Sequence, residues 1–307
     1  MNNGEILYIY DANLTNPNGD PDDENRPRMD YQSRRNLVSD VRLKRYIRDF
    51  LQDQGKQLYV ENPENGQVVD ASTRIKNFLG HPAKAEDIQQ IVKELIDVRL
   101  FGATIPIKKD KEENKGDSIK ITGPTQFSWG YSLNEVDLVD SYSITSRFSS
   151  GEGKKQGTIG KDYRVYYSLI GFYGIISGHR AMHTGMNDDD AVLLDKCLIK
   201  AIPQQATRSK IGQFPKLYIR TVYKDQETVL GDLRDSVTLK NKKNLRTIEN
   251  VVVSLDSLAS KLEKYKHLIE KIYFWQDSNL KTEQKGSPET LEGVLLKSGL
   301  NCEPIKI

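Results

Sequence analysis

Cysteines, long apolar runs and a cleavable leader are missing or scarce in this sequence, and each absence excludes a class of protein. The 307-residue chain has two cysteines, Cys197 and Cys302, whose spacing matches neither a metal motif nor a disulfide framework. No stretch approaches the roughly 18 consecutive apolar residues of a membrane span, so we expect no membrane association. The first residues lack the basic and apolar segments of a signal peptide. A soluble, cytoplasmic protein is therefore expected.

Catalytic signatures are equally scarce. The sequence has no Gly-x-Ser-x-Gly motif, P-loop or dinucleotide-binding motif. His179 and His183 are four residues apart but lack the glutamate of a zinc-binding HExxH helix, so we expect no zinc site. The acidic run Asp20–Glu24 could hold Mg²⁺ or supply a general base, but its Asn and Gly neighbours favour an ordinary turn. We expect no catalytic residue, no metal and no cofactor.

Net charge is also small, but charge is unevenly distributed. The chain has 45 Lys/Arg and 43 Asp/Glu, which gives a net charge of +2. Residues 11–24 hold five acids and no base, whereas residues 26–48 hold eight Lys/Arg and two acids. Such asymmetry is typical of a protein that binds a polyanion, although solvated charged helices also produce it.

Apolar residues follow both strand and helix periods without a strict βαβ repeat, which favours an α+β fold. Strands are predicted around residues 6–10, 119–133, 166–176, 217–223 and 251–255, with a hairpin turn at 61–66 and a solvated loop at 108–117. Helices are predicted over about 85–100, 188–201 and 257–272. In the helix that begins at Asp188 we expect four buried side chains: Val192, Leu193, Cys197 and Leu198. Without internal repeats or a clean linker, the chain is predicted to be one domain with inserted segments.

A basic amphipathic helix over about 40–52 is the strongest physical signal. Ser39 is the expected N-cap, and Asp40 suits the first turn. One arc of the helix is apolar and predicted to be buried: Leu43, Tyr46, Ile47, Phe50 and Leu51. The opposite arc is cationic: Arg42, Lys44, Arg45 and Arg48. Only Asp40 and Lys44 have the spacing and order of a helical ion pair, so most of this stripe is expected to be unpaired.

The cationic stripe favours contact with RNA phosphates, because guanidinium groups match phosphate oxygens. Four upstream arginines could extend the same track: Arg26, Arg28, Arg34 and Arg35. If about six of these cations neutralise RNA phosphates, log K should fall with log salt with a slope of roughly −4. The alternative is an ordinary solvent-facing helix.

Three weaker candidates accompany the stripe. Residues 143–162 predict a projecting hairpin rich in Ser, Gly and Lys, with Arg147, Phe148, Lys154, Lys155 and Lys161 suited to single-stranded nucleic acid. The turn at 123–129 places Phe127 and Trp129 where core packing and a ligand role are equally favoured. Residues 208–212 form a short basic turn before a strand.

Several short motifs together resemble one known family. In chain order they are Asn16-Pro-Asn-Gly-Asp-Pro-Asp22, Arg26-Pro-Arg28, LVSDVRLKRYIRD at 37–49, DVRLFG at 97–102, GPTQF at 123–127 with Ser132-Leu133, TIGK at 158–161, and Arg208-Ser209. This set resembles the CRISPR-associated Cascade backbone subunit of type I systems, within the repeat-associated mysterious protein superfamily and closest to subtype I-B. The matches span about two thirds of the chain, and the last 80 or so residues add little.

The resemblance implies a modified RRM-like (ferredoxin-like) palm, a helical fingers insertion over about 53–120 and a projecting thumb hairpin over about 140–164. Several copies would stack along one CRISPR guide RNA beside other Cascade subunits and leave guide segments free to pair with target DNA. The residues that would contact RNA are Arg28, Arg34, Arg42, Lys44, Arg45, Arg48, Gln126, Phe127, Arg147, Phe148, Lys161 and Arg208. The type I branch does not cut, so the resemblance implies a protein that is not an enzyme.

Two alternatives remain open at this point. Related backbone subunits of type III complexes cut RNA with an aspartate in an early loop, and Asp20–Glu24 lies in a comparable loop. A metal-dependent RNA-cleaving subunit is therefore the second hypothesis. A DNA-binding regulator is the third, and it would be a dimer that prefers duplex DNA.

Overall fold

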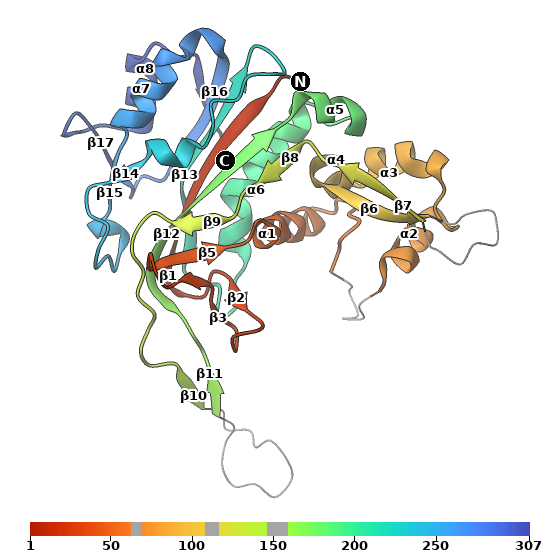
Figure 1. Cartoon of the computed structure of the whole chain (residues 1–307), viewed down its shortest axis with the longest axis horizontal. Helices are drawn as coiled ribbons and strands as arrows, with labels where there is room; N and C mark the ends of the chain where they lie inside the picture. Colours follow the sequence, from red (N-terminus) through yellow and green to blue (C-terminus); the bar gives the residue numbers. More distant parts are fainter. Residues whose placement is uncertain (63–68, 108–116, 146–158) are drawn as a thin grey trace, which may run out of the picture.

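The computed structural model describes residues 1–62, 69–107, 117–145 and 159–307 (Figure 1). Four of the candidate side chains fall outside these ranges: Arg147, Phe148, Lys154 and Lys155. So do most of the predicted turn at 61–66 and of the predicted loop at 108–117. Helices and several sheets mix along the chain, which confirms the α+β class. No helix within the described ranges combines the length and apolarity that a membrane crossing requires.

A nine-stranded sheet forms the centre of the protein, in the order β19-β16-β13-β1-β12-β9-β5-β4, with β8 also paired to β12. Its strands are β1 (Gly4–Thr15), β4 (Met29–Asp30), β5 (Arg35–Val38), β8 (Thr125–Phe127), β9 (Gly130–Ser132), β12 (Val165–Ile176), β13 (Gln213–Tyr223), β16 (Ile269–Gln276) and β19 (Cys302–Pro304). The strands predicted around 6–10, 166–176 and 217–223 are thus confirmed. β1 is central because it pairs antiparallel with both β12 and β13.

Side chains of β1 alternate between two cores, as the geometry of a strand requires. Ile6, Tyr8 and Tyr10 pack on the face covered by α1 (Asp40–Asp53) and α6 (Asp188–Gln204). Leu7 and Ile9 pack on the other face, under α7 (Asp256–Lys264) and α8 (Leu291–Lys297). Burial on both faces explains why this strand is almost continuously apolar.

Residues between α1 and β8 build a third, smaller cluster that lies beside α1 (Figure 1). Its elements are α2 (Ala71–Leu79), η1 (Ala85–Asp87), α3 (Ile88–Glu94), α4 (Ile96–Phe101), β6 (Gly102–Ile107) and β7 (Asp117–Thr122). The single helix predicted over 85–100 is wrong, because Leu95 is extended (φ −91°, ψ 99°) and separates α3 from α4. The Ile96 N–H donates to the Gln57 carbonyl at 3.2 Å and therefore does not continue the hydrogen bonding of α3.

The C-terminal region adds a four-stranded sheet over the second core. Its strands are β14 (Thr238–Leu239), β15 (Val252–Ser254), β17 (Lys281–Gln284) and β18 (Ser287–Pro288), accompanied by η2 (Leu233–Ser236), η3 (Ile248–Asn250) and η4 (Lys266–Leu268). The helix predicted to 272 ends at Lys264 instead. Ile269 and Ile272 are in β16, where pairing with β13 buries both side chains. Long-range strand pairing has overridden a helical pattern.

The helix predicted from Asp188 is confirmed and extends to Gln204, with Asn187 as its N-cap. Cys197 and Leu198 are buried as predicted, and Leu193 is partly buried. The expected burial of Val192 is wrong, because its side chain lies on the solvent side of the helix. A further short helix, α5 (Gly178–Thr184), precedes it.

A buried carboxyl group lies where β1 approaches its end. Asp11 accepts a hydrogen bond from the Tyr167 hydroxyl at 3.3 Å, and the Lys216 ammonium lies 3.7 Å away. Lys216 also contacts Asp277 at 2.7 Å. Burial raises the pKa of Asp11 from 3.8 to about 6, and the opposing charge of Lys216 only partly offsets this. The folded protein therefore holds this proton more tightly than the unfolded chain.

Asp11 should make the folded state less stable as pH rises from about 4 to about 6, because its folded pKa exceeds its unfolded pKa. An Asp11→Asn variant should lose this part of the pH dependence. Its stability relative to the parent should rise by up to about 3 kcal/mol between pH 4 and pH 7, from a shift of about two pKa units. Urea unfolding across this pH range measures the difference. Parallel pH profiles of the two proteins would contradict the assignment.

Candidate nucleic-acid interface

The central sheet brings three separate loops together at one end. Thr15 of β1 lies opposite Val165 of β12, and Ala12 lies opposite Gln213 of β13. The loop after β1, the segment before β12 and the turn before β13 therefore converge. We call this convergence of residues 16–28, 159–164 and 207–212 the loop junction. It includes β11 (Ile159–Lys161), which pairs with β10 (Ser143–Thr145) to form a projecting hairpin (Figure 1).

Arg164 is the main connection within the loop junction. Its guanidinium donates to the Leu14 carbonyl at 2.7 Å and to the Arg208 carbonyl at 3.1 Å. The same guanidinium is held by Asp162 at 2.8 Å. One side chain thus joins the hairpin base, the end of β1 and the turn before β13.

Lys210 fixes the loop that follows β1. Its ammonium donates to the main-chain carbonyls of Asn16 and Pro17. Burial, and secondarily the nearby Arg42 charge, lower the pKa of Lys210 to about 7. The Asn16 N–H in turn donates to the Ser209 carbonyl at 3.0 Å, so the two segments hold each other in place.

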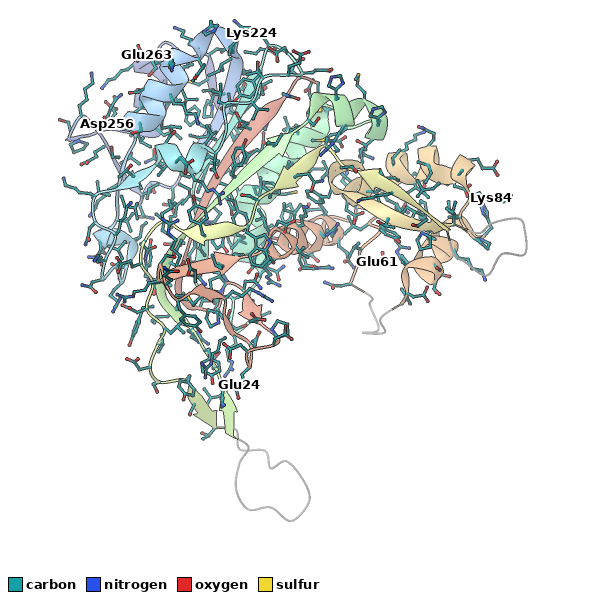
Figure 2. All side chains as sticks on the ribbon, in the orientation of Figure 1. Glu24, Glu61, Lys84, Lys224, Asp256 and Glu263 are labelled. Carbon is teal, nitrogen blue, oxygen red and sulfur yellow. The ribbon has the colours of Figure 1, made fainter. Side chains whose placement is uncertain are left out.

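The hairpin base is tied to the acidic loop through Glu24 (Figure 2). Lys161 donates to the Glu24 carboxylate at 2.6 Å, and the Tyr163 hydroxyl donates to it at 2.7 Å. These hydrogen bonds lower the pKa of Glu24. The Arg26 guanidinium lies 4.6 Å from the centre of the Tyr163 ring. Residues 16, 24–25, 161–163 and 207–209 line a small polar cavity of about 270 Å³ at this point.

Exposed cations gather around the loop junction. The Arg208 side chain is 63% exposed, and its one ion pair is a distant contact of 3.7 Å with Asp162. Lys161 is 48% exposed despite its contact with Glu24. Arg34 is about half exposed, with Glu135 and Asp137 as its partners. Three of the predicted RNA-binding residues therefore present charge to solvent.

The basic helix forms as predicted, but its cations are not free. Ser39 caps it by accepting from the Arg42 N–H at 3.2 Å, and all five residues of the apolar arc are buried. Lys44 contacts Asp40 and the Gln126 side-chain oxygen, each at 3.0 Å. Arg45 pairs with Asp49 in the reverse order along the helix. The expectation of a mostly unpaired stripe is therefore wrong.

Arg48 is part of a buried ion pair that connects α1 to the third cluster. Its Nε lies 2.9 Å from Asp97, which is 1% exposed. The Asp97 carboxylate also accepts from the main-chain N–H groups of Tyr59 and Val60, at 2.7 and 3.1 Å. Arg48 thus positions the neighbouring cluster, and a partner 49 residues away hides this role from helix geometry.

The remaining predicted residues are mostly occupied by protein contacts. Arg28 pairs with Asp20 at 3.1 Å, and the Arg42 guanidinium lies 4.1 Å from the centre of the Tyr46 ring. The Gln126 amide also donates to the carbonyls of Phe101 and Gly123. The two aromatics at 123–129, for which core packing and a ligand role were equally favoured, lie in different environments. Phe127 is 8% exposed and packs in the core, whereas Trp129 is 48% exposed.

The sequence gives no local signal for several residues that organise this interface. Arg164, Lys210 and Tyr163 act through partners far along the chain. Lys210 lies in the basic turn noted at 208–212, but its contacts with the loop after β1 were not predicted. In the acidic loop Asp20 is neutralised by Arg28, and Glu24 by Lys161. Across the described ranges, no group of three or more His, Cys, Asp or Glu residues is placed to hold a metal ion.

Replacing Arg48 with alanine should destabilise the fold by about 3 kcal/mol or more, because it leaves the buried Asp97 carboxylate without its cation. Arg45→Ala should cost only about 0.5 kcal/mol, since Arg45 and Asp49 are partly exposed. Urea unfolding of both variants measures the two losses. A double variant that also carries Asp97→Asn should recover part of the Arg48→Ala loss. Equal, small losses in the two single variants would show that Arg48 is merely solvated.

Comparison with known proteins identifies the family. The sequence model for CRISPR-associated protein Cas7 matches residues 2–256. A Haloferax volcanii protein described as CRISPR-associated protein Cas7 is 35% identical over 301 residues, covering 91% of this chain and 88% of that protein.

Two solved chains with similar structures come from a CRISPR RNA-guided surveillance complex and from a pre-nicking form of such a complex. The first is 13% identical, with a TM-score of 0.46 over 97% of this chain and 98% of that one. The second is 14% identical, with a TM-score of 0.49 over 97% and 99%. The family match and the curated relative are sufficient by themselves: this chain belongs to the CRISPR-associated Cas7 family.

Proposed function

We propose that this protein binds CRISPR guide RNA as the repeated backbone subunit of a type I Cascade surveillance complex. Family membership supports the proposal, and the observation that carries it is the pair of exposed cations at the loop junction, Lys161 and Arg208. Arg34, which is outside the junction, is also about half exposed. The loop junction includes the base of the β10–β11 hairpin, which projects from the central sheet (Figure 1). A sugar-phosphate chain passing this point would meet several cationic side chains from each copy.

In this proposal the RNA follows the loop junction and continues along α1. Arg208 and Lys161 would bind phosphates directly, since their charged groups reach solvent. Lys44 and Arg45 would contribute through their remaining exposed surface, whereas Arg48 would act indirectly by fixing the third cluster. Sequence recognition would come from base pairing between guide and target DNA.

The proposed assembly assigns a role to each part of the chain. The central sheet with α1 and α6 would be the RRM-like palm, residues 53–120 the fingers and residues 140–164 the thumb. Several copies would stack on one guide RNA with other Cascade subunits, in the cytoplasm. Each thumb would reach a neighbouring copy and divide the guide into short segments available for pairing.

The proposal treats this subunit as non-catalytic. In its acidic loop, Asp20 pairs with Arg28 and Glu24 pairs with Lys161, which supports a structural role for both carboxylates. Incubating the RNA-loaded assembly with complementary RNA and Mg²⁺ tests this directly, and we expect the RNA to remain intact. Evenly spaced cuts that disappear in an Asp20→Asn or Asp22→Asn variant would establish the type III-like alternative.

RNA affinity should depend on salt through the junction cations. A double variant, Arg208→Gln with Lys161→Gln, should bind a labelled repeat–spacer transcript more weakly, with a salt slope smaller in magnitude by about 1.4. Fluorescence anisotropy at several salt concentrations measures the slope.

The matched control is Lys264→Gln with Lys297→Gln, which removes two exposed cations on α7 and α8, away from the loop junction (Figure 1). This control should leave the slope unchanged. Identical slopes for the two double variants would place the RNA elsewhere, and a complete lack of RNA binding would contradict the proposed function.

A further inference from the structure

Trp129 is a large aromatic side chain that the fold holds at the surface. Its residue is 48% exposed, whereas Phe127, two positions earlier, is buried. The Arg28 guanidinium lies 5.9 Å from the centre of the indole ring. Single exposed apolar residues are common in proteins, so exposure alone indicates nothing.

The backbone that carries Trp129 is fixed on both sides. The Trp129 carbonyl accepts from the Arg234 guanidinium at 2.7 Å, and the preceding Ser128 N–H donates to the Tyr173 carbonyl at 2.9 Å. At Gly130 a Cβ atom would lie 2.4 Å from the Phe172 ring, so only glycine lets this strand lie so close to the core. The main chain beneath the exposed indole is therefore fixed, so a ligand that stacks on the ring needs no rearrangement of this strand.

Trp129 is also next to the proposed RNA path. β5 pairs with β9 so that Val38 lies opposite Gly130. Trp129 directly precedes Gly130, and Ser39, the N-cap of α1, directly follows Val38. Arg28, the cation over the indole, belongs to the loop junction. Its main chain is held by the Asn18 carbonyl at 3.1 Å, and its guanidinium is held by Asp20.

An exposed aromatic ring beside an arginine fits a ligand that has both a flat aromatic surface and negative charge. Nucleobases stack on such rings, and their phosphates favour the neighbouring cation. A second copy of this chain or another subunit would also cover apolar surface. Trp and Arg are also common at protein interfaces. The exposed cations of the adjoining loop junction favour a polyanionic partner, and RNA is therefore the occupant that we argue.

Resting on the proposed function, we infer that Trp129 is a stacking site for one unpaired nucleobase of the bound RNA, with Arg28 holding an adjacent phosphate. Within this site Arg28 makes the charged contact, whereas Trp129 makes a ring contact that carries no charge. Trp129 should therefore strengthen RNA binding without changing how many phosphates are neutralised. This separates its contribution from that of the junction cations.

The chain has two tryptophans, so a Trp275→Phe background leaves Trp129 as the one indole that reports binding. Titration with a short single-stranded RNA should quench Trp129 fluorescence. Trp129→Ala should weaken binding by about 5- to 150-fold with an unchanged salt slope. Trp129→Phe should retain most of the affinity, and Arg28→Gln should reduce the magnitude of the slope by about 0.7.

An abasic RNA of the same length and charge provides the matched control, because it keeps the phosphates and removes the bases. Wild-type protein on abasic RNA should behave like Trp129→Ala on ordinary RNA, and combining the two changes should add no further loss.

RNA binding with unchanged Trp129 fluorescence, or equal affinity of Trp129→Ala and wild type, would overturn the stacking site and leave the proposed function standing. Self-association without RNA that shields Trp129 and requires it would show a protein interface instead. Absence of RNA binding by every variant and by wild type would reject the proposed function itself.

Discussion

The antiparallel pairing of β1 with β12 on one side and β13 on the other is the constraint on which the interface depends. This pairing determines that the loop after β1, the segment before β12 and the turn before β13 meet at one end of the sheet. Residues separated by 150 or more positions in sequence, such as Leu14 and Arg164, then come within hydrogen-bond distance. The buried tyrosines and aliphatic residues of β1 hold the pairing by filling two cores at once. The position of every exposed cation at the loop junction follows from this arrangement.

Electrostatics divides the cations of the interface into two groups. Three of those on α1 face carboxylates of their own chain, Asp40, Asp49 and Asp97, and Arg42 lies against the Tyr46 ring. At the loop junction, Arg208 is the most exposed cation, Lys161 is exposed although it pairs with Glu24, and Lys210 is partly buried. A polyanion gains most from a cation that is exposed and weakly paired, and at this interface Arg208 fits that description best. The α1 cations therefore stabilise the fold, and the exposed cations of the loop junction remain available to a polyanion.

Sequence reasoning succeeded where nearby residues decide the outcome. The Ser39 cap, the apolar arc of α1 and the central strands each depend on patterns a few residues long, and all are confirmed. It failed where residues distant in sequence decide the outcome. Leu95 interrupts the helix predicted over 85–100, Ile269 is in a strand and not in the predicted helix, and Arg48 pairs with Asp97. The anchoring by Arg164 and Lys210 could not be predicted, since their partners lie 150 and 193 residues away. For the same reason, the different environments of Phe127 and Trp129 became distinguishable only in the folded chain.

The most direct test of the account is a cryo-EM map of the assembly purified from cells that express a repeat–spacer array. The account predicts a ribonucleotide strand whose phosphates lie within about 4 Å of the charged groups of Arg208 and Lys161 in successive copies. A strand that instead follows α7 and α8, with the loop junction covered by protein or open to solvent in each copy, would contradict it.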